Sequence, residues 1–346
     1  MKKVQVETIQ EKTAADLIDD LNHCRYSILD SIGCRKLRLE MFLPGLVSAI
    51  IVRYLVWKAK RKSGNNWTAT VRGYLIKLFK RGAPYRVEPN DKVPINTGGI
   101  VIGFNHPSLG EILRLIALVS KHYPYNSYLF PVNLPWYEAL CPVVDKMEEA
   151  GFKLTPIVTP STRKKILKVA GTEMAKIADD INVGFNHAYL GLAKEFINNG
   201  DIVIVAPSAT RQEKVFRTDA ELAKKEKIEP GTMSLLATNL SRGVDKEGVR
   251  IIPIAVNPPA GAGRGLNLRS FYRFGIAEPF TLGEAVELTK ERYGDFRGRL
   301  FDYEFLARIA VKLFTMHCHG IIAPFKEDYS MNGLAEILEE SKKVVY

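Results

Sequence analysis

Beyond residue 84 the sequence alternates short apolar runs with longer segments of helical spacing, and few folds accommodate this alternation. Strand-length apolar runs lie at Gly99–Phe104, Ser127–Val132, Leu154–Val158, Ile202–Ala206, Val249–Val256 and Phe271–Ala277. Segments of helical spacing lie at Glu111–Lys121, Pro135–Leu140, Thr162–Asp179, His187–Asn198, Gly231–Ser241, Tyr303–Cys318 and Gly333–Lys343. The pattern predicts an α/β fold with a mostly parallel central sheet flanked by helices.

The residues before this alternation predict helices of a different character. Residues from about Thr13 to Arg38 have mildly amphipathic helical spacing. Met41–Trp57 is the most apolar stretch of the chain, but it is short for a bilayer span, and Pro44 and Arg53 interrupt it. Four basic residues follow between positions 58 and 62, and Trp67–Arg81 is a second, basic and amphipathic segment.

Apolar helices with adjoining basic residues are typical of proteins that lie in the interface of an anionic membrane. We therefore expect residues 1–85 to be an N-terminal helical, membrane-associating segment and residues 86–346 to be the α/β domain with its C-terminal helices. Two alternatives stay open: Leu46–Trp57 is a core helix whose basic neighbours face solvent, or it spans a bilayer. The first 20 residues lack the apolar region of a signal peptide.

Charge and cysteine content narrow the classes of partner and compartment. The 346 residues carry a formal charge of +11, which favours an anionic membrane, a phosphate-bearing substrate or nucleic acid. We expect no nucleic acid, because many basic residues adjoin the apolar Met41–Trp57 stretch and no nucleic-acid-binding motif accompanies them. The four cysteines show no CxxC spacing, so we predict neither a disulfide framework nor a zinc site, and a reducing compartment is favoured.

A histidine stands where a predicted strand ends and a predicted helix begins. His106 follows the apolar run that ends at Phe104, and Glu111 opens the helical segment five residues later. In open α/β sheets, ligands bind beyond the carboxyl ends of the strands, and one helical turn can bring Glu111 back beside the imidazole. A histidine oriented by a carboxylate is the minimal arrangement for a general base. Alternatively, Ser108 and Glu111 form a capping box that only starts the helix.

A second polar segment follows another predicted strand. The run Ile202–Ala206 leads into a Pro-Ser-Ala-Thr-Arg sequence that ends at Arg211. Arginine offers several hydrogen-bond donors in one plane, and Ser208 and Thr210 add hydroxyl donors on short side chains. The segment is therefore suited to binding a phosphate or a carboxylate. The alternative is a surface turn whose arginine meets only water. A third run contains Pro253, which cannot donate a ladder hydrogen bond and is unusual in a central strand.

These segments occur in the order, and at about the spacings, of the sequence blocks of the glycerolipid acyltransferase superfamily, which includes the glycerol-3-phosphate and lysophosphatidate acyltransferases. Asn105-His106-Pro-Ser-Leu-Gly-Glu111 resembles the first block, N-H-x-[SQ]-x-x-D. Ala206-Pro-Ser-Ala-Thr-Arg211 is similar to the third block, F-P-E-G-T-R-S, and to the A-P-S-G-G-R variant of soluble plastid enzymes. Ile252-Pro-Ile-Ala-Val256 resembles the fourth block, V-P-[IV]-[AS]-[IV], and Gly151–Ile157 is weakly similar to the second.

The chain departs from this family pattern at several positions. Glu111 stands where the family has Asp, and its longer side chain can still reach His106. Ser208 stands where most members have Glu, although the plastid variant also has Ser there. The second block lacks its Arg, so Lys153 or Arg163 would have to supply the corresponding phosphate contact.

The resemblance implies an O-acyltransferase that moves a fatty acyl group from a CoA or acyl-carrier-protein thioester to a hydroxyl of a glycerol-phosphate or lysophospholipid acceptor. It implies that His106 is the general base, that Glu111 orients it, and that substrate is bound by Asn105, Ser108, Ser208, Thr210, Arg211 and Arg217. No cofactor or metal is expected beyond acyl-CoA or acyl-ACP as co-substrate. The expected location is the cytoplasmic face of a membrane, as a peripheral or monotopic protein, or the soluble cytoplasm. The alternative is a catalytically silent, lipid-binding relative with the same fold.

Overall fold

The computed structural model describes residues 12–82, 85–87, 99–104, 111–123, 126–205, 249–257, 272–276 and 279–281. Within this part of the chain, strands alternate with helices and most strand pairs are parallel, which confirms the predicted α/β fold class. The chain divides into two compact units. Unit 1 contains Met1–Lys77, Tyr125–Phe196 and Asp201–Ile204, and unit 2 contains Leu78–Pro124, Ile197–Gly200 and Val205–Tyr346. The predicted division at residue 85 stays a prediction.

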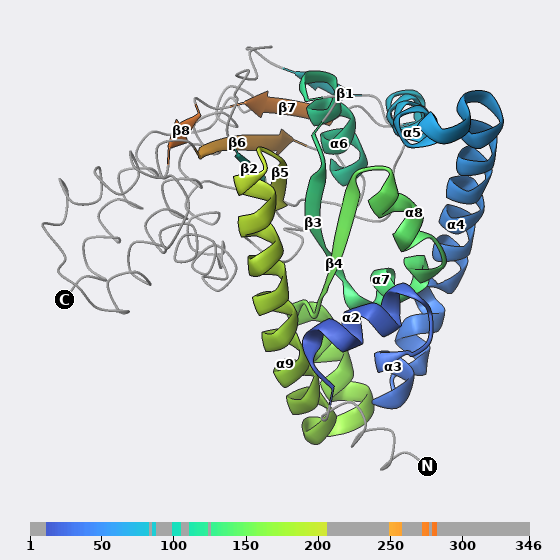
Figure 1. The fold of residues 1–346 in the computed structure, drawn as a ribbon. Coiled ribbons are helices and arrows are strands. Elements are labelled where there is room, and N and C mark those ends of the chain that lie inside the picture. Colours follow the sequence, from blue (N-terminus) through green and yellow to red (C-terminus); the bar gives the residue numbers. More distant parts are fainter. Residues whose placement is uncertain are drawn as a thin grey trace, which may run out of the picture. The chain divides into compact units, whose positions relative to one another are not determined.

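Unit 1 is built on a parallel sheet of three strands (Figure 1). The strands are β3 (Tyr128–Asn133), β4 (Phe152–Ile157) and β5 (Ile202–Val205). β3 lies in the middle and pairs with both neighbours, from Tyr128↔Phe152 on one side and from Tyr128↔Ile202 on the other. All three strands were predicted from their apolar runs, within two residues at each end.

The helices of unit 1 come mostly from the N-terminal part of the chain and from the connections between its strands. They are α2 (Ala14–Asn22), α3 (Ile28–Ser31), α4 (Arg35–Ser63), η1 (Gly64–Asn66), α5 (Trp67–Gly82), α7 (Leu134–Leu140), η2 (Cys141–Val143), α8 (Val144–Glu149) and α9 (Pro160–Asn198). The last residues of α5 and α9 belong to unit 2.

The segment from about Thr13 to Arg38, which was predicted to be helical, forms α2, α3 and the start of α4, because three local signals divide it. α2 ends where Cys24 adopts a left-handed backbone conformation, with φ 52°. Ser27 then starts α3, since its side chain accepts a hydrogen bond of 3.1 Å from the backbone N–H of Asp30. Gly33, with φ 78°, ends α3 before α4 begins.

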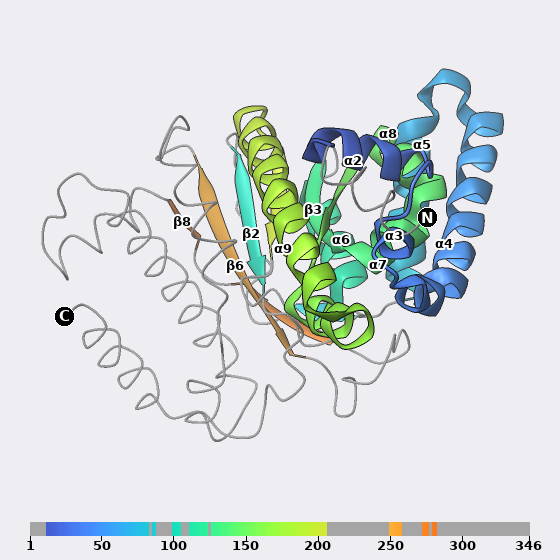
Figure 2. The same cartoon turned by 90° about the horizontal axis from the view of Figure 1, so that it is seen from below.

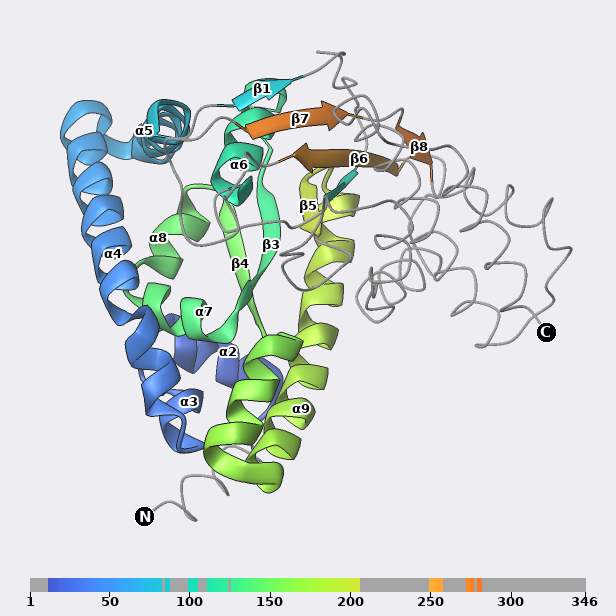
Figure 3. The ribbon, with the colours of Figure 1, turned by 180° about the vertical axis from the view of Figure 1, so that it is seen from behind.

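The two helices predicted at Thr162–Asp179 and His187–Asn198 are also divided at the wrong place. Residues 160–198 are helical except at Gly171, whose φ of 87° lies in a region that glycine adopts readily. The chain doubles back there, so α9 has two arms (Figure 3). Arg163 and Asp179 hold the arms together by an ion pair of 2.7 Å. The break therefore lies at a glycine inside the first predicted helix.

The apolar stretch Met41–Trp57 lies within α4, and its two faces have different surroundings. The buried face consists of small and β-branched residues that pack mainly on α7: Gly45, Ala49, Val52, Val56 and Ala59. The other face is exposed and carries Leu39, Phe42, Leu43, Leu46, Val47, Ile50, Ile51, Tyr54 and Trp57. We call these nine exposed residues the α4 stripe. The core-helix interpretation of Leu46–Trp57 is therefore wrong for this face.

The described residues of unit 2 form a mixed sheet and the helix α6. Its elements are β1 (Tyr85–Val87), β2 (Ile100–Phe104), α6 (Glu111–His122), β6 (Arg250–Asn257), β7 (Tyr272–Ile276) and β8 (Phe280–Thr281). β1 pairs with β7 and β2 with β6 in parallel, whereas β7 and β8 run antiparallel to β6. The short strands β1 and β8 were not predicted. The helices predicted at Gly231–Ser241, Tyr303–Cys318 and Gly333–Lys343 lie outside the described residues.

Pro253 lies inside β6 and yet interrupts no hydrogen bond to β2. The N–H of Arg250 donates to Gly99 over 3.1 Å, so by alternation the even-numbered residues of β6 face β2 and Pro253 faces the opposite edge. On that edge the pairing changes between Ile251, which pairs with β8, and Ile254, which pairs with β7. From Ile276 to Phe280 the chain advances four positions, whereas their partners in β6 are three positions apart.

Candidate active site

The predicted strand and helix on either side of His106 are both present. β2 ends at Phe104 and α6 begins at Glu111. The chain therefore passes from a strand to a helix across six residues, and these six contain Asn105, His106 and Ser108. Those three residues lie outside the described part of the chain, and the side chain of Glu111 does as well. The roles predicted for them stay predictions.

The first and fourth sequence blocks are attached to neighbouring parallel strands. Gly103 pairs with Pro253 and Phe104 with Ile254, so the residues just before Asn105 lie beside the middle of the fourth block. Parallel strands point their carboxyl ends to the same edge of a sheet, which is where α/β proteins usually bind ligands. The strands that carry the first and fourth blocks are therefore adjacent and parallel in unit 2.

The start of β2 is fixed by a close backbone contact. A Cβ added to Gly99 would lie 2.7 Å from the Cα of Ile197, at the end of α9, so no larger residue fits without movement of the backbone. Gly99 is buried, and its carbonyl accepts the hydrogen bond from Arg250 described above. This contact sets the position of the strand that leads to His106.

The third block begins directly after β5. β5 ends at Val205, one residue before the segment that contains Ser208, Thr210 and Arg211. These three residues and Arg217 lie outside the described residues, so their predicted contact with a phosphate stays a prediction.

The segment that is weakly similar to the second block forms β4 in unit 1. Gly151 precedes it with φ 87°, and Phe152 and Leu154 fill the core. The two cations considered as substitutes for the missing arginine both have carboxylate partners. Lys153 pairs with Glu148, and Arg163 pairs with Asp179. Both pairs are partly exposed, so we expect neither cation to be committed to its partner strongly.

One buried charge beside the candidate site was missed in the sequence. Arg114 lies in α6, three residues after Glu111, and is fully buried, with its guanidinium carbon 3.9 Å from the ring centroid of Tyr272. Residues 114–120 of α6 are all buried. The signal that could have identified Arg114 is that it is the one charged residue in the otherwise apolar run from Ile112 to Val119. An arginine stays charged when buried, so it places a fixed positive charge near the start of α6.

Comparisons with known proteins give a structural likeness but no match in sequence. No protein-family model matches the chain, and no curated protein matches its sequence. Among solved structures, the chain is similar to an acyltransferase of the class that the sequence blocks resemble. That protein is the 1-acyl-sn-glycerophosphate (LPA) acyltransferase PlsC from Thermotoga maritima, with a TM-score of 0.42 and 12% identity over 85% of this chain and 96% of that chain. A likeness of this size assigns no function by itself.

Proposed function

We propose that the chain is an O-acyltransferase that moves a fatty acyl group from a CoA or acyl-carrier-protein thioester to a hydroxyl of a glycerol-phosphate or lysophospholipid. One observation carries the proposal: the Asn-His-x4-Glu block occupies the passage from β2 to α6, beside the parallel strand that holds the fourth block. A general base at the carboxyl end of a strand is well positioned for a substrate in the crevice beyond it.

The proposed reaction needs one proton carrier and no metal. His106 takes the proton of the acceptor hydroxyl, and the oxygen attacks the thioester carbonyl carbon. Glu111 orients His106 and stabilises its charged form. Backbone N–H groups near Ser208–Thr210, or at the start of the helix after His106, stabilise the oxyanion. The thiolate then leaves and recovers the proton from His106, while Arg211 and Arg217 hold the phosphate of the acceptor.

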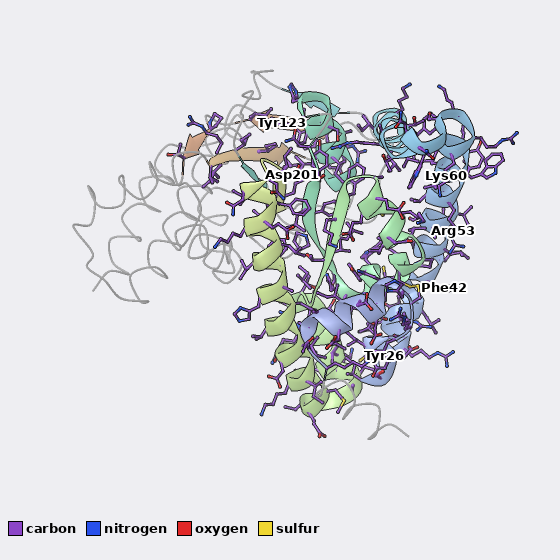
Figure 4. The ribbon with its side chains drawn as sticks, viewed as in Figure 1. Tyr26, Phe42, Arg53, Lys60, Tyr123 and Asp201 are labelled. Carbon is purple, nitrogen blue, oxygen red and sulfur yellow. A yellow bond between two sulfur atoms is a disulfide. The ribbon has the colours of Figure 1, made fainter. Side chains whose placement is uncertain are left out.

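The α4 stripe supports a membrane surface as the location of this reaction. One helical segment among the described residues, Arg35–Leu78, has an 18-residue window apolar enough to cross a membrane, and only 22% of that window is buried. In Figure 4, Phe42, Arg53 and Lys60 mark successive positions along α4. Beyond the stripe, Arg61 stacks on Trp57 at 5.0 Å and Lys60 on Trp67 at 4.8 Å. Aromatic and basic side chains at one end of an apolar helix are suited to the headgroup region of an anionic bilayer.

The test is acyl transfer by the purified protein with acyl-CoA or acyl-ACP and either glycerol-3-phosphate or lysophosphatidate, followed by thiol release and lipid product. We expect His106→Ala to lower kcat by about 10²- to 10⁴-fold, which is the usual contribution of a general base. His187→Ala is the matched control, because His187 is exposed on α9. An unchanged rate for His106→Ala would remove the mechanism.

The same assay distinguishes an active enzyme from a catalytically silent, lipid-binding relative. A lipid-binding protein without activity would bind lysolipid in a pull-down but release no thiol from acyl-CoA. The substitutions of the third block, Ser208 and Ala209, favour this alternative, since they remove the carboxylate that most family members have there. For an active enzyme, Arg211→Ala should raise the KM for the phosphate-bearing acceptor more than it lowers kcat.

A further inference from the structure

The described residues contain one disulfide, which contradicts the prediction that the cysteines are unpaired. Cys24, just after α2, is bonded to Cys141, at the start of η2, with their Cα atoms 5.6 Å apart and 117 positions between them in sequence. Cys24 is exposed and Cys141 is half-buried, so a thiol from solvent has a path to the bond. Cys34, by contrast, is fully buried, and burial raises the pKa of its thiol, which makes it unreactive.

The backbone at Cys24 is held in a conformation that cysteine seldom adopts. Among the described residues, Cys24 is the one non-glycine residue with a positive φ. It occupies the position just past the end of α2 where glycine is the usual residue, and its N–H donates to Leu21 over 3.1 Å. Such strained residues persist only where the surroundings hold them, and they occur often at functional sites. Opening the bond removes one of the constraints that hold this conformation.

The disulfide is one of four contacts by which α7 and the residue that follows it hold the N-terminal segment. Tyr137 in α7 donates a hydrogen bond to Asn22. Its neighbour Glu138 accepts hydrogen bonds from the hydroxyl of Ser27 over 2.7 Å and from the N–H of Leu29 over 3.0 Å. Cys141 follows within one turn and forms the covalent contact. Accordingly, α2, α3 and α7 lie side by side in two views (Figures 1 and 2).

The held segment leads directly into α4, which carries the exposed stripe. Arg38 in the first turn of α4 pairs with Asp30 of α3 over 2.7 Å, and α4 itself packs on α7. A change in how tightly residues 22–34 are held would therefore affect the start of α4 directly, through contacts within unit 1.

We propose that Cys24–Cys141 is a thiol–disulfide exchange site, opened by a dithiol reductant, that controls how firmly residues 22–34 are held on α7. A thiolate of the dithiol attacks the Sγ of Cys24, and the Sγ of Cys141 leaves as a thiolate and takes up a proton. The second thiol of the dithiol then attacks the mixed disulfide and releases Cys24. The protein gains two thiols, and the dithiol becomes a cyclic disulfide. This proposal goes beyond the acyltransferase function, since no step involves His106 or Glu111.

The test uses the full-length protein and dithiothreitol as the dithiol. After treatment under native conditions, alkylation followed by peptide mass spectrometry should find label on Cys24 and Cys141 and none on Cys34. Hydrogen–deuterium exchange of the amides in residues 22–34 should then accelerate by about tenfold or more, with β3 and β4 unchanged. Cys141→Ser should show the fast exchange with or without reductant, and the control Cys34→Ala should respond like the wild type.

Three results would overturn the proposal. In the first, the folded protein resists the dithiol, and label reaches Cys24 only after denaturation. In the second, the bond opens but exchange in residues 22–34 does not change. In the third, exchange accelerates throughout unit 1, which would make the disulfide a general stabiliser. If Cys141→Ser does not fold, the wild type with and without reductant still distinguishes these outcomes.

Discussion

Helices α4 and α6 are both apolar in sequence, but their surroundings differ. In α6, residues 114–120 are buried on every side, including the charged Arg114. In α4, one face packs on α7 and the other presents nine large apolar side chains to the exterior. Apolar character therefore does not by itself place a helix in a core. Whether an apolar helix lies in a core depends on the width of its buried face. That width increases with the number of elements that pack around the helix.

The largest expected difference between the two helices is in the cost of removing a leucine. Leu118 in α6 is 1% exposed, so Leu118→Ala leaves a cavity and should lower the free energy of unfolding by about 2–5 kcal/mol. Leu43 in α4 is 67% exposed, and Leu43→Ala should cost less than about 0.5 kcal/mol. Urea unfolding of both variants measures this, and equal costs would show that the α4 stripe is covered in solution.

A charge in the α4 stripe should act on membrane binding and not on folding. We expect Leu43→Asp to weaken binding to phosphatidylglycerol-containing vesicles by about tenfold to a hundredfold, because an aspartate is costly to place among acyl chains. Val183→Asp is the matched control, since Val183 is 55% exposed but lies on α9. Co-sedimentation measures both. Similar losses for the two variants would argue against a specific membrane face on α4.

The contact of α7 with residues 27–29, which depends on Glu138, should weaken as the pH rises. Burial raises the pKa of Glu138 to about 7, despite the hydrogen bonds from Leu29 and Ser27, which favour its ionised form. Because the folded-state pKa lies above the unfolded value of about 4.5, the stability linked to this carboxyl is fully present below pH 4.5. It is lost as the pH rises through 7, by at most about 3 kcal/mol.

Substitution of Glu138 tests this dependence directly. Glu138→Gln cannot ionise, so the fall in unfolding free energy between pH 5 and 8 should be smaller in this variant, by about 2 kcal/mol. Glu149→Gln is the control, because that side chain is 44% exposed and pairs with Lys146 at the surface. Denaturation midpoints across the pH range give the slopes, and parallel curves for Glu138→Gln and wild type would contradict the expectation.

The smallest expected effect concerns the contact between α4 and α7. A Cβ at Gly45 would lie 2.6 Å from the carbonyl oxygen of Ala139, so Gly45→Ala forces the helices apart and should cost about 1–2 kcal/mol. Nothing lies within 4 Å of a Cβ at Gly73 in α5, and Gly73→Ala should be neutral or stabilise by up to about 1 kcal/mol. Thermal unfolding of the pair measures both, and a neutral Gly45→Ala would mean that the contact is looser than described.

The sequence allowed prediction of those elements whose signals are local. β2 and α6 were predicted within one residue of their observed bounds. A short apolar run indicates a strand and a helical spacing indicates a helix, and each pattern can be recognised within a few residues. Residues with positive φ mark several of the breaks that were missed or misplaced, at Cys24 and at two glycines. Gly33 and Gly171 could have been weighed as helix ends, but glycine in a helical pattern is an ambiguous signal.

Features that depend on distant residues were not predicted. The pairing of Cys24 with Cys141 joins segments 117 positions apart, and neither cysteine has a neighbour that indicates a partner. The exposure of the α4 stripe depends on α7 covering only the opposite face, which no hydropathy pattern specifies. The same reason applies to the candidate site: the blocks containing His106 and Arg211 are far apart in sequence, so their order indicates a family resemblance but not a distance.

The change of partner at Pro253 has a consequence for the strand that leads to the candidate site. Because Pro253 has no N–H to donate, the outer side of β6 loses no ladder hydrogen bond where its partner changes from β8 to β7. The inner side, from Arg250 to Ile254, keeps its register with β2 across this change. The change of outer partner at Pro253 therefore leaves β2, the strand that leads to His106, paired with β6 in one continuous register.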